Sequence, residues 1–403
     1  MAVPSYALAA VTLDTGAGTP WLSFSAFGTL DEVHSSQDKA DFTSNVFQLN
    51  GAGYTRSWSA VVDSLVGAQL TANFLSNLSA VVQVIAEQNY NGTFTPHIEW
   101  ANLKYQFTPD LSVRAGRSVL PTFLFSDTRK VGYTYPWARP PVEVYGLLPL
   151  TSSDGVDFSE RLHGGNLSNT LQGNFGQSSV QNENGGGTAS TKGSYGFSDT
   201  TEYESFTLRL SYQHTRLFIA GVPFLDEFRL FGPPGIAIAD EYESNPKNVV
   251  IEVIGASYDP GHWFVMSEWG HTKANSFVGD KSGWYASGGY RAAQFTPYVT
   301  YAEASATSNS DPGLALTGLP SAQVGFAAAL NAGLNTLLQK AIPEQRTLTA
   351  GARWDFMKNL DLKLQVDHTR LDADSFGTLT NVQPGLRPGG TVNLFSVALN
   401  FVF

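Results

Sequence analysis

The chain has 403 residues, of which 15% are charged and 12% aromatic, and its formal net charge is −11. The absence of cysteine excludes disulfides, Cys-ligated zinc sites and thiol nucleophiles. The acidic balance argues against nucleic acid as a partner, because phosphate binding requires a basic field. No run of about 18 apolar residues occurs, so the sequence predicts no transmembrane helix.

The first residues lack a strand pattern. We interpret 1–19 as an N-terminal extension or an expression remnant, because it has neither the charged start nor the apolar core of a signal peptide. The expectation is that an export signal has been removed from the mature chain.

From Trp21 onward, apolar and polar residues alternate with a period of two in many short segments. Clear examples are 22–30, 66–74, 101–107, 167–175, 206–212, 347–354 and 360–367. Period two indicates strands rather than helices. The weakest candidates are 155–162 and 216–222. The last strand places Phe395, Val397, Leu399, Phe401 and Phe403 on one face, with Ser396 and Asn400 on the other.

The connections between these segments alternate in length. Short ones are expected at 76–77, 108–110, 163–165, 214–215, 259–261, 293–294 and 357–359, and long ones near 34–58, 118–155, 178–200, 223–247, 306–344 and 373–390. Outer-membrane barrels have short turns at one rim and long loops at the other. About sixteen strands are counted, so residues 20–403 are predicted to form one transmembrane, antiparallel, up-and-down all-β barrel. Its first strand, near Trp21, should pair with the last and leave no free edge.

The third long loop, 118–155, is rich in aromatic residues and proline, and is too apolar to remain exposed to water. We expect it to fold into the lumen, with Arg129, Lys130 and Arg139 projecting into the narrowest part and Asp127 and Glu143 nearby. The alternative is a loop packed over the rim or against a neighbouring subunit.

Charged residues fall at lumen-facing positions in this register. The basic ones are Lys104, Arg114, Arg161, Arg209, Arg291, Arg353 and Lys363, and the acidic ones are Glu87, Asp157, Glu252, Glu268, Asp355, Asp361 and Asp367. Rings of charge select ions in a water-filled pore. Alternatively many of these residues pair with each other, for example Arg353 with Asp355, or Lys363 with Asp361.

One segment departs from the β pattern: Ser321–Ile342, between Pro320 and Pro343, predicts a helix within an outer loop at 320–343. It could cap the rim, or act as a lid or partner-binding element. Asp240, Glu241 and Glu243 form an acidic cluster that could hold a divalent cation, or be a solvated loop.

Common catalytic and nucleotide-binding motifs are missing from the sequence, and neither an enzymatic activity nor a cofactor or metal is expected. His271 and His368 fall on outward positions, where a membrane-interface role is simpler than a hydrolase site.

The terminal Phe403, the sixteen alternating segments and a long loop after the fifth strand, preceded by Arg114-Ala115-Gly116-Arg117, together resemble the trimeric Gram-negative porin family. The stretch Val131-Gly132-Tyr133-Thr134-Tyr135-Pro136-Trp137-Ala138-Arg139-Pro140-Pro141 is similar to a segment of porin-like proteins of proteobacteria. The resemblance implies an outer-membrane homotrimer in contact with lipid and lipopolysaccharide, whose third loop forms the constriction. The acidic PEFGG-type tip of general enteric porins is replaced here by Pro-Trp-Ala-Arg-Pro-Pro.

We therefore expect a passive diffusion channel for small hydrophilic solutes, with a mild preference for anionic, carboxylate-type solutes. The residues expected at the constriction and in selectivity are Arg114, Arg117, Asp127, Arg129, Lys130, Tyr135, Trp137, Arg139, Glu143, Lys104, Arg161, Arg209 and Arg353. Two alternatives remain open. An outer-membrane barrel enzyme of the lipase or protease type would lack conductance, and a soluble all-β protein would need no detergent.

Overall fold

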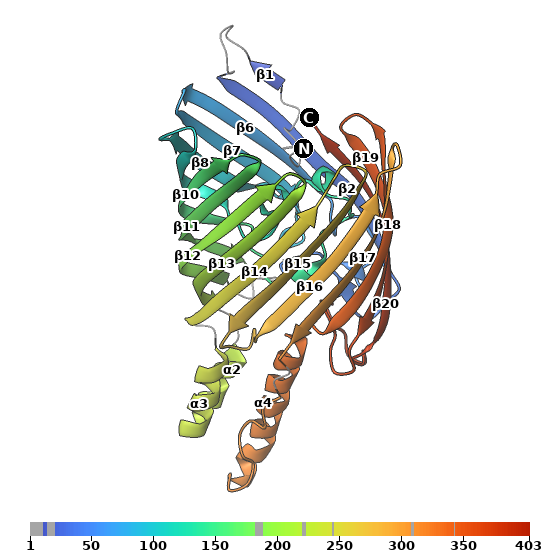
Figure 1. Cartoon of the computed structure of the whole chain (residues 1–403). Coiled ribbons are helices and arrows are strands. Elements are labelled where there is room, and N and C mark those ends of the chain that lie inside the picture. The colour runs from blue at the N-terminus through green and yellow to red at the C-terminus, as the bar shows by residue number, and fades with distance from the viewer. Residues whose placement is uncertain are drawn as a thin grey trace.

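The fold is a closed antiparallel β-barrel, seen in a computed structural model that describes residues 11–13, 21–181, 188–219, 223–243, 246–307, 310–341 and 343–403. Sixteen strands form the barrel wall, which confirms the expected fold class (Figure 1). They are β2 (Leu22–Ser35), β6 (Leu65–Leu75), β7 (Leu78–Glu87), β8 (His97–Gln106), β9 (Leu111–Val119), β10 (Ser152–Gly164), β11 (Leu167–Gln181), β12 (Thr188–Tyr203), β13 (Phe206–Ile219), β14 (Lys247–Tyr258), β15 (Trp263–Ala274), β16 (Lys281–Tyr290), β17 (Phe295–Ala306), β18 (Gln345–Met357), β19 (Leu360–Leu371) and β20 (Gly390–Val402).

The barrel closes where the first and last long strands meet. β2 pairs with β20 in a register that sets Leu30 against Leu399, and the amide of Phe403 donates to the carbonyl of Ala26 at 2.7 Å. The expected pairing of the two ends is thus confirmed. A short strand, β1 (Val11–Leu13), also pairs with the start of β2, while most of the 1–19 segment lies outside the described residues.

Short turns join the strands at the end where the chain terminates, and long loops leave the opposite end (Figure 1). Three local predictions were wrong. His214 and Thr215 lie within β13, and the turn before that strand is at Glu204 and Ser205. Residues 216–219 continue β13 rather than form a separate strand, and 220–222 lie outside the described residues. The expected loop at 178–200 is mostly strand, because β11 and β12 continue to Gln181 and from Thr188.

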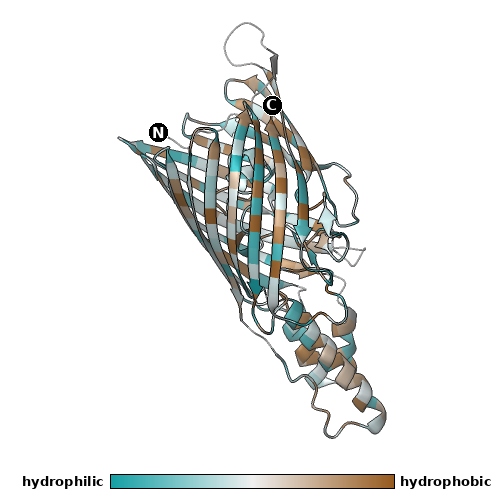
Figure 2. Ribbon diagram, turned by 90° about the vertical axis from the view of Figure 1, so that its right-hand side faces the viewer, coloured by the Kyte–Doolittle hydropathy of each residue, from teal (hydrophilic) through white to brown (hydrophobic). Residues whose placement is uncertain are grey.

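The outward face of the barrel carries many exposed apolar side chains. Hydropathy alternates along the strands that face the viewer in Figure 2. Exposed aromatic residues flank the short-turn end: Trp21, Phe74, Tyr105, Tyr203, Phe206, Tyr258, Trp263, Tyr290, Phe295, Trp354 and Phe403. Such a girdle is typical of barrels at a membrane interface. Glu252 was expected to face the lumen, but it is exposed in β14, where the buried Ile251 and Val253 alternate with it.

Helices form a projection beyond the long-loop end of the barrel (Figures 1 and 2). α2 (Pro223–Phe228), η4 (Arg229–Phe231) and α3 (Pro233–Tyr242) come from one loop, and α4 (Ser321–Lys340) from another. They share a core that includes Leu225, Phe228, Leu330 and Leu334. The predicted helix is confirmed as α4, although Ile342 lies outside the described residues.

None of the helices in the described ranges is long and apolar enough to cross a membrane.

Candidate functional site

The third long loop runs from Leu120 to Thr151, between β9 and β10, and is called the inserted loop below. It contains η1 (Ser126–Thr128), η2 (Gly132–Thr134) and α1 (Val142–Tyr145). Its apolar side chains form one core with inward residues of the barrel: Phe123, Tyr135, Trp137 and Val144 pack with residues of β14–β17 such as Ile251, Phe264, Tyr285 and Tyr298. The loop therefore lies inside the lumen, as expected, and packs against one side of the wall.

Trp137 and Tyr135 are buried in this contact, at 1% and 6% exposure. The indole N–H of Trp137 lies 2.9 Å from the hydroxyl of Thr300 and 3.1 Å from that of Ser287. Both rings were expected at the constriction, but they are packed between the loop and the wall. They attach the loop to the wall, which accounts for the aromatic composition of this stretch.

Arg139 also differs from the expectation, because it is 5% exposed rather than projecting into open solvent. Its guanidinium bonds the Ser396 hydroxyl at 2.7 Å and the Asp63 carboxylate at 2.6 Å. It lies 3.4 Å from Asp367 and 3.8 Å from Asp31. Burial alone disfavours the charged guanidinium, but Asp63, Asp31 and Asp367 outweigh it and hold the pKa of Arg139 above its ordinary value.

The remaining loop cations are engaged as well. Arg129 donates to the backbone carbonyls of Leu148 and Tyr145 at 2.9 and 2.8 Å. Lys130 lies 2.6 Å from both oxygens of Glu87 in β7. Asp127 is exposed.

Glu143 is buried in α1 and faces the wall rather than water. Its carboxylate accepts hydrogen bonds from Gln345, at 2.8 Å, and from Thr347 in β18. Burial raises the pKa of Glu143, against the lowering effect of these two bonds. Glu143 is therefore another attachment point of the inserted loop.

Cations on the wall hold the loop from the other side. The Lys363 ammonium, fully buried in β19, donates to the carbonyls of Gly132, Tyr135 and Trp137 at 2.6–2.8 Å. Its predicted pairing with Asp361 is thus not its main contact. Arg353 bonds the carbonyl of Tyr133 at 2.6 Å and pairs with Asp355 at 2.6 Å, as the pairing alternative expected.

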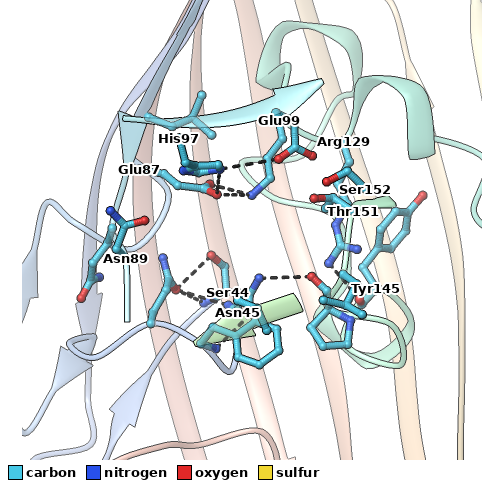
Figure 3. A pocket seen from close by; sticks show the side chains of 18 of the residues that line it. Ser44, Asn45, Glu87, Asn89, His97, Glu99, Arg129, Tyr145, Thr151 and Ser152 are labelled. Carbon is cyan, nitrogen blue, oxygen red and sulfur yellow. Dashed lines mark hydrogen bonds and ion pairs between the residues drawn. The ribbon is translucent and has the colours of Figure 1, made fainter. Parts of the chain in front are cut away.

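A cavity of about 370 Å³ remains between the inserted loop and the part of the wall formed by β6–β11 (Figure 3). Its charged lining is balanced: the cations are Arg117, Arg129, Lys130 and Arg139, and the carboxylates are Asp63, Glu87, Glu99 and Asp154. Arg117 pairs with Asp154 at 2.7 Å, and His97 lies 3.7 Å from Glu87 and 3.6 Å from Glu99. Ion pairs therefore neutralise most of the charge at the loop.

A different group of charges lies on the wall nearer the short turns. Lys104 in β8 is directly opposite Arg114 in β9, which is opposite Asp157 in β10 and bonds it at 2.7 Å. Arg161 follows Asp157 by four residues, on the same face of β10, and is exposed. We call Lys104, Arg114, Asp157 and Arg161 the wall cluster. It holds three cations and one carboxylate.

Arg209, in β13, was also expected in the pore. It is 6% exposed and donates to the side chain of Gln172 at 3.1 Å. Arg161 and Arg209 lie at the same level of the wall, because Arg161 pairs with Thr170 in β11, Thr170 with Thr200 in β12, and Thr200 with Arg209.

Several functional carboxylates were missed from the sequence. Asp31, Asp63 and Glu99 were not singled out, although each lies at the loop–wall contact or the cavity. Asp31 and Glu99 sit at inward positions of recognisable strands, so the alternation pattern could have indicated them. Asp63 lies in an irregular connection, where no periodicity exists to assign a direction.

Other candidate sites have structural roles. Asp240 and Glu243 pair with Arg229 at 2.6 and 2.8 Å, which occupies the carboxylates that a divalent cation would need. His271 stacks on Trp269, and His368 bonds Asn393 at 2.7 Å, both on outward positions as expected. No cluster of three potential metal ligands occurs among the described residues.

Comparison with solved structures gives likenesses over nearly the whole chain. An anion-selective porin from Comamonas acidovorans matches with a TM-score of 0.56 and 12% identity, covering 95% of this chain and 100% of that one. OmpF of Salmonella typhi, solved in complex with daunomycin, matches with a TM-score of 0.54 and 12% identity, covering 95% of this chain and 97% of that one. The outer-membrane channel DcaP of Acinetobacter baumannii matches with a TM-score of 0.53 and 11% identity, covering 98% of this chain and 100% of that one.

No protein-family model matches the sequence, and no curated protein matches it. At these identities the likeness concerns the fold, so the chain has the barrel fold of Gram-negative outer-membrane porins.

Proposed function

We propose that the protein is a passive diffusion channel of a Gram-negative outer membrane, for small hydrophilic solutes with a preference for anions such as carboxylates. The barrel fold and its porin neighbours support the channel role. The single observation that carries the anion preference is the wall cluster, in which three cations surround one carboxylate on the lumen face.

The inserted loop contributes little to this preference. The charges around its cavity are balanced and mostly paired, so their fields largely cancel beyond contact distance. The ammonium of Lys104 makes no ion pair or hydrogen bond with any residue in the described ranges, and the guanidinium of Arg161 makes only a 3.4 Å contact with Thr170. Uncompensated cations on a water-filled wall raise the local concentration of anions.

The test is the reversal potential of the purified protein in a planar bilayer under a potassium chloride gradient. We expect the sign of the reversal potential to show that chloride is more permeant than potassium. The magnitude of this potential should decrease when the salt is raised from 0.1 to 1 M, because the Debye length falls from about 10 to about 3 Å. A potential of the opposite sign contradicts the anion preference. Absence of any conductance contradicts the channel.

The assembly proposed from the family resemblance is a homotrimer embedded in outer-membrane lipid. The closed, apolar outer wall supports the membrane setting, and an apolar barrel face suits a closed cyclic assembly. Native mass spectrometry in detergent should give three chains per particle, and a monomer would contradict this assembly.

A further inference from the structure

A second cavity, of about 160 Å³, opens at the long-loop end of the lumen. It lies between the inserted loop, the start of β16, the end of α4 and the loops that follow β2 and β19. Its charged lining consists of Arg129, Glu143, Lys281 and Lys340.

Two of these four residues are already engaged elsewhere. Arg129 donates to loop carbonyls, and Glu143 turns its carboxylate to Gln345 and Thr347. The cavity is therefore left with two ammonium groups, those of Lys281 and Lys340.

Lys281 is the first residue of β16 and shares its inward face with Tyr285 and Ser287. Its side chain is half-buried. Neither the Lys281 ammonium nor the Lys340 ammonium forms an ion pair or hydrogen bond with any residue in the part of the chain that the structure describes. Lys281 is partly withdrawn from water without a counter-charge, which favours the binding of an anion, and the exposed Lys340 adds a second positive charge at the cavity.

Neutral donors complete the lining. The hydroxyls of Thr43 and Thr380 lie 3.5 Å apart at the edge of the cavity and can rotate toward a bound oxygen. The cavity is below the roughly 300 Å³ of sites for drug-sized ligands, so it suits a small ion.

We propose that Lys281 and Lys340 form a binding site for a small oxyanion, a carboxylate or phosphate, at the long-loop entrance of the lumen. The site lies at the opposite end from the wall cluster, where Lys104 and Arg161 are close to the short turns. Anions entering from the long-loop side would meet it first. The inference deepens the proposed channel function, but binding at Lys281 does not require that the channel be selective.

The first test is calorimetric titration of the detergent-solubilised protein with inorganic phosphate, and separately with succinate. We expect saturable binding that weakens roughly fivefold or more in Lys281→Met, less in Lys340→Gln, and recovers in Lys281→Arg. Lys358→Met is the matched control, because this exposed lysine lies in a short turn at the other end of the barrel. Equal affinity in the parent and Lys281→Met overturns the proposal.

A second test uses oriented channels in a planar bilayer, with phosphate added to one side at a time. Phosphate from the long-loop side should reduce the chloride current, and Lys281→Met should remove this effect while leaving the effect from the other side unchanged. Block that is equal from both sides overturns the entrance site. A channel that binds phosphate through Lys281 but shows no anion preference would contradict the proposed selectivity alone.

Discussion

Arg139 donates a hydrogen bond from Nε to the Asp63 carboxylate at 2.6 Å, and so joins the inserted loop to the connection between β2 and β6. The same guanidinium reaches Ser396 in β20. One side chain therefore ties three separate segments together at the seam where the barrel closes.

Replacing Arg139 should loosen the inserted loop. Arg139→Gln leaves Asp31, Asp63 and Asp367 without their counter-charge, and removing one partner of a buried ion pair costs about 3–5 kcal/mol. We expect a lower unfolding temperature in detergent and a larger, noisier single-channel conductance. Arg346→Gln is the control, because the Arg346–Glu303 pair is largely exposed and contributes about 0–1 kcal/mol. An unchanged conductance in Arg139→Gln would show that the loop does not depend on this anchor.

The wall cluster should set the charge preference. In Lys104→Gln/Arg161→Gln one cation remains, and Asp157 neutralises it. Each lost charge changes the energy of an anion at close range by about 1 kcal/mol in water, so the loss of two charges should lower the chloride-to-potassium permeability ratio by up to roughly thirtyfold. The measurement is the reversal potential. The control is Lys358→Gln, which removes one positive charge at an exposed short turn away from the wall cluster. If the double variant kept the permeability ratio of the parent protein, the charge preference would not come from the wall cluster.

Trp137 should matter for stability through both its ring and its N–H. Trp137→Phe loses the bonds to Thr300 and Ser287 and should cost about 0.5–1.5 kcal/mol, while Trp137→Ala also leaves a cavity and should cost about 3–5 kcal/mol. Thermal unfolding in detergent measures both. If the alanine variant were as stable as the phenylalanine variant, the ring would not be part of the packed core.

Glu143 should make stability depend on pH. Because burial raises its pKa, the folded chain binds this proton more tightly than the unfolded chain, and the contribution of Glu143 to stability falls as pH rises above about 4.3. Glu143→Gln cannot titrate, so we expect it to be more heat-stable than the parent at pH 8 and similar at pH 4. Glu241→Gln, on exposed α3, is the control. If Glu143→Gln became less heat-stable relative to the parent as pH rises, the predicted direction of the pH dependence would be wrong.

The barrel could be predicted from the sequence because its signal is repeated. Phe395, Val397 and Leu399 must face one way in β20 and Ser396 and Asn400 the other, and a one-residue slip would reverse them all. The prediction failed at β11 and β12, where Gly, Ser and Thr follow each other and the two faces look alike.

The role of the loop residues could not be predicted in the same way. An arginine in an aromatic loop is equally compatible with an open pore and with a buried anchor, and only the positions of Asp63, Asp367 and Ser396 decide between them. These residues are 76, 228 and 257 positions away in sequence. The alternation likewise places Ser396 and Asn400 on the polar face of the last strand but does not indicate that both are fully buried beneath the loop.

Because the inserted loop packs against one side of the barrel, the inner surface has two regimes of tolerance to mutation. Inward residues of β14–β20 such as Tyr285 and Lys363 behave like the interior of a globular protein, where a change of shape costs folding energy. Lys104 in β8 and Arg161 in β10 border solvent instead and can vary at little cost. The charge preference of this barrel could therefore be re-engineered, or diverge during evolution, by point changes on one half of the wall while the other half preserves the fold.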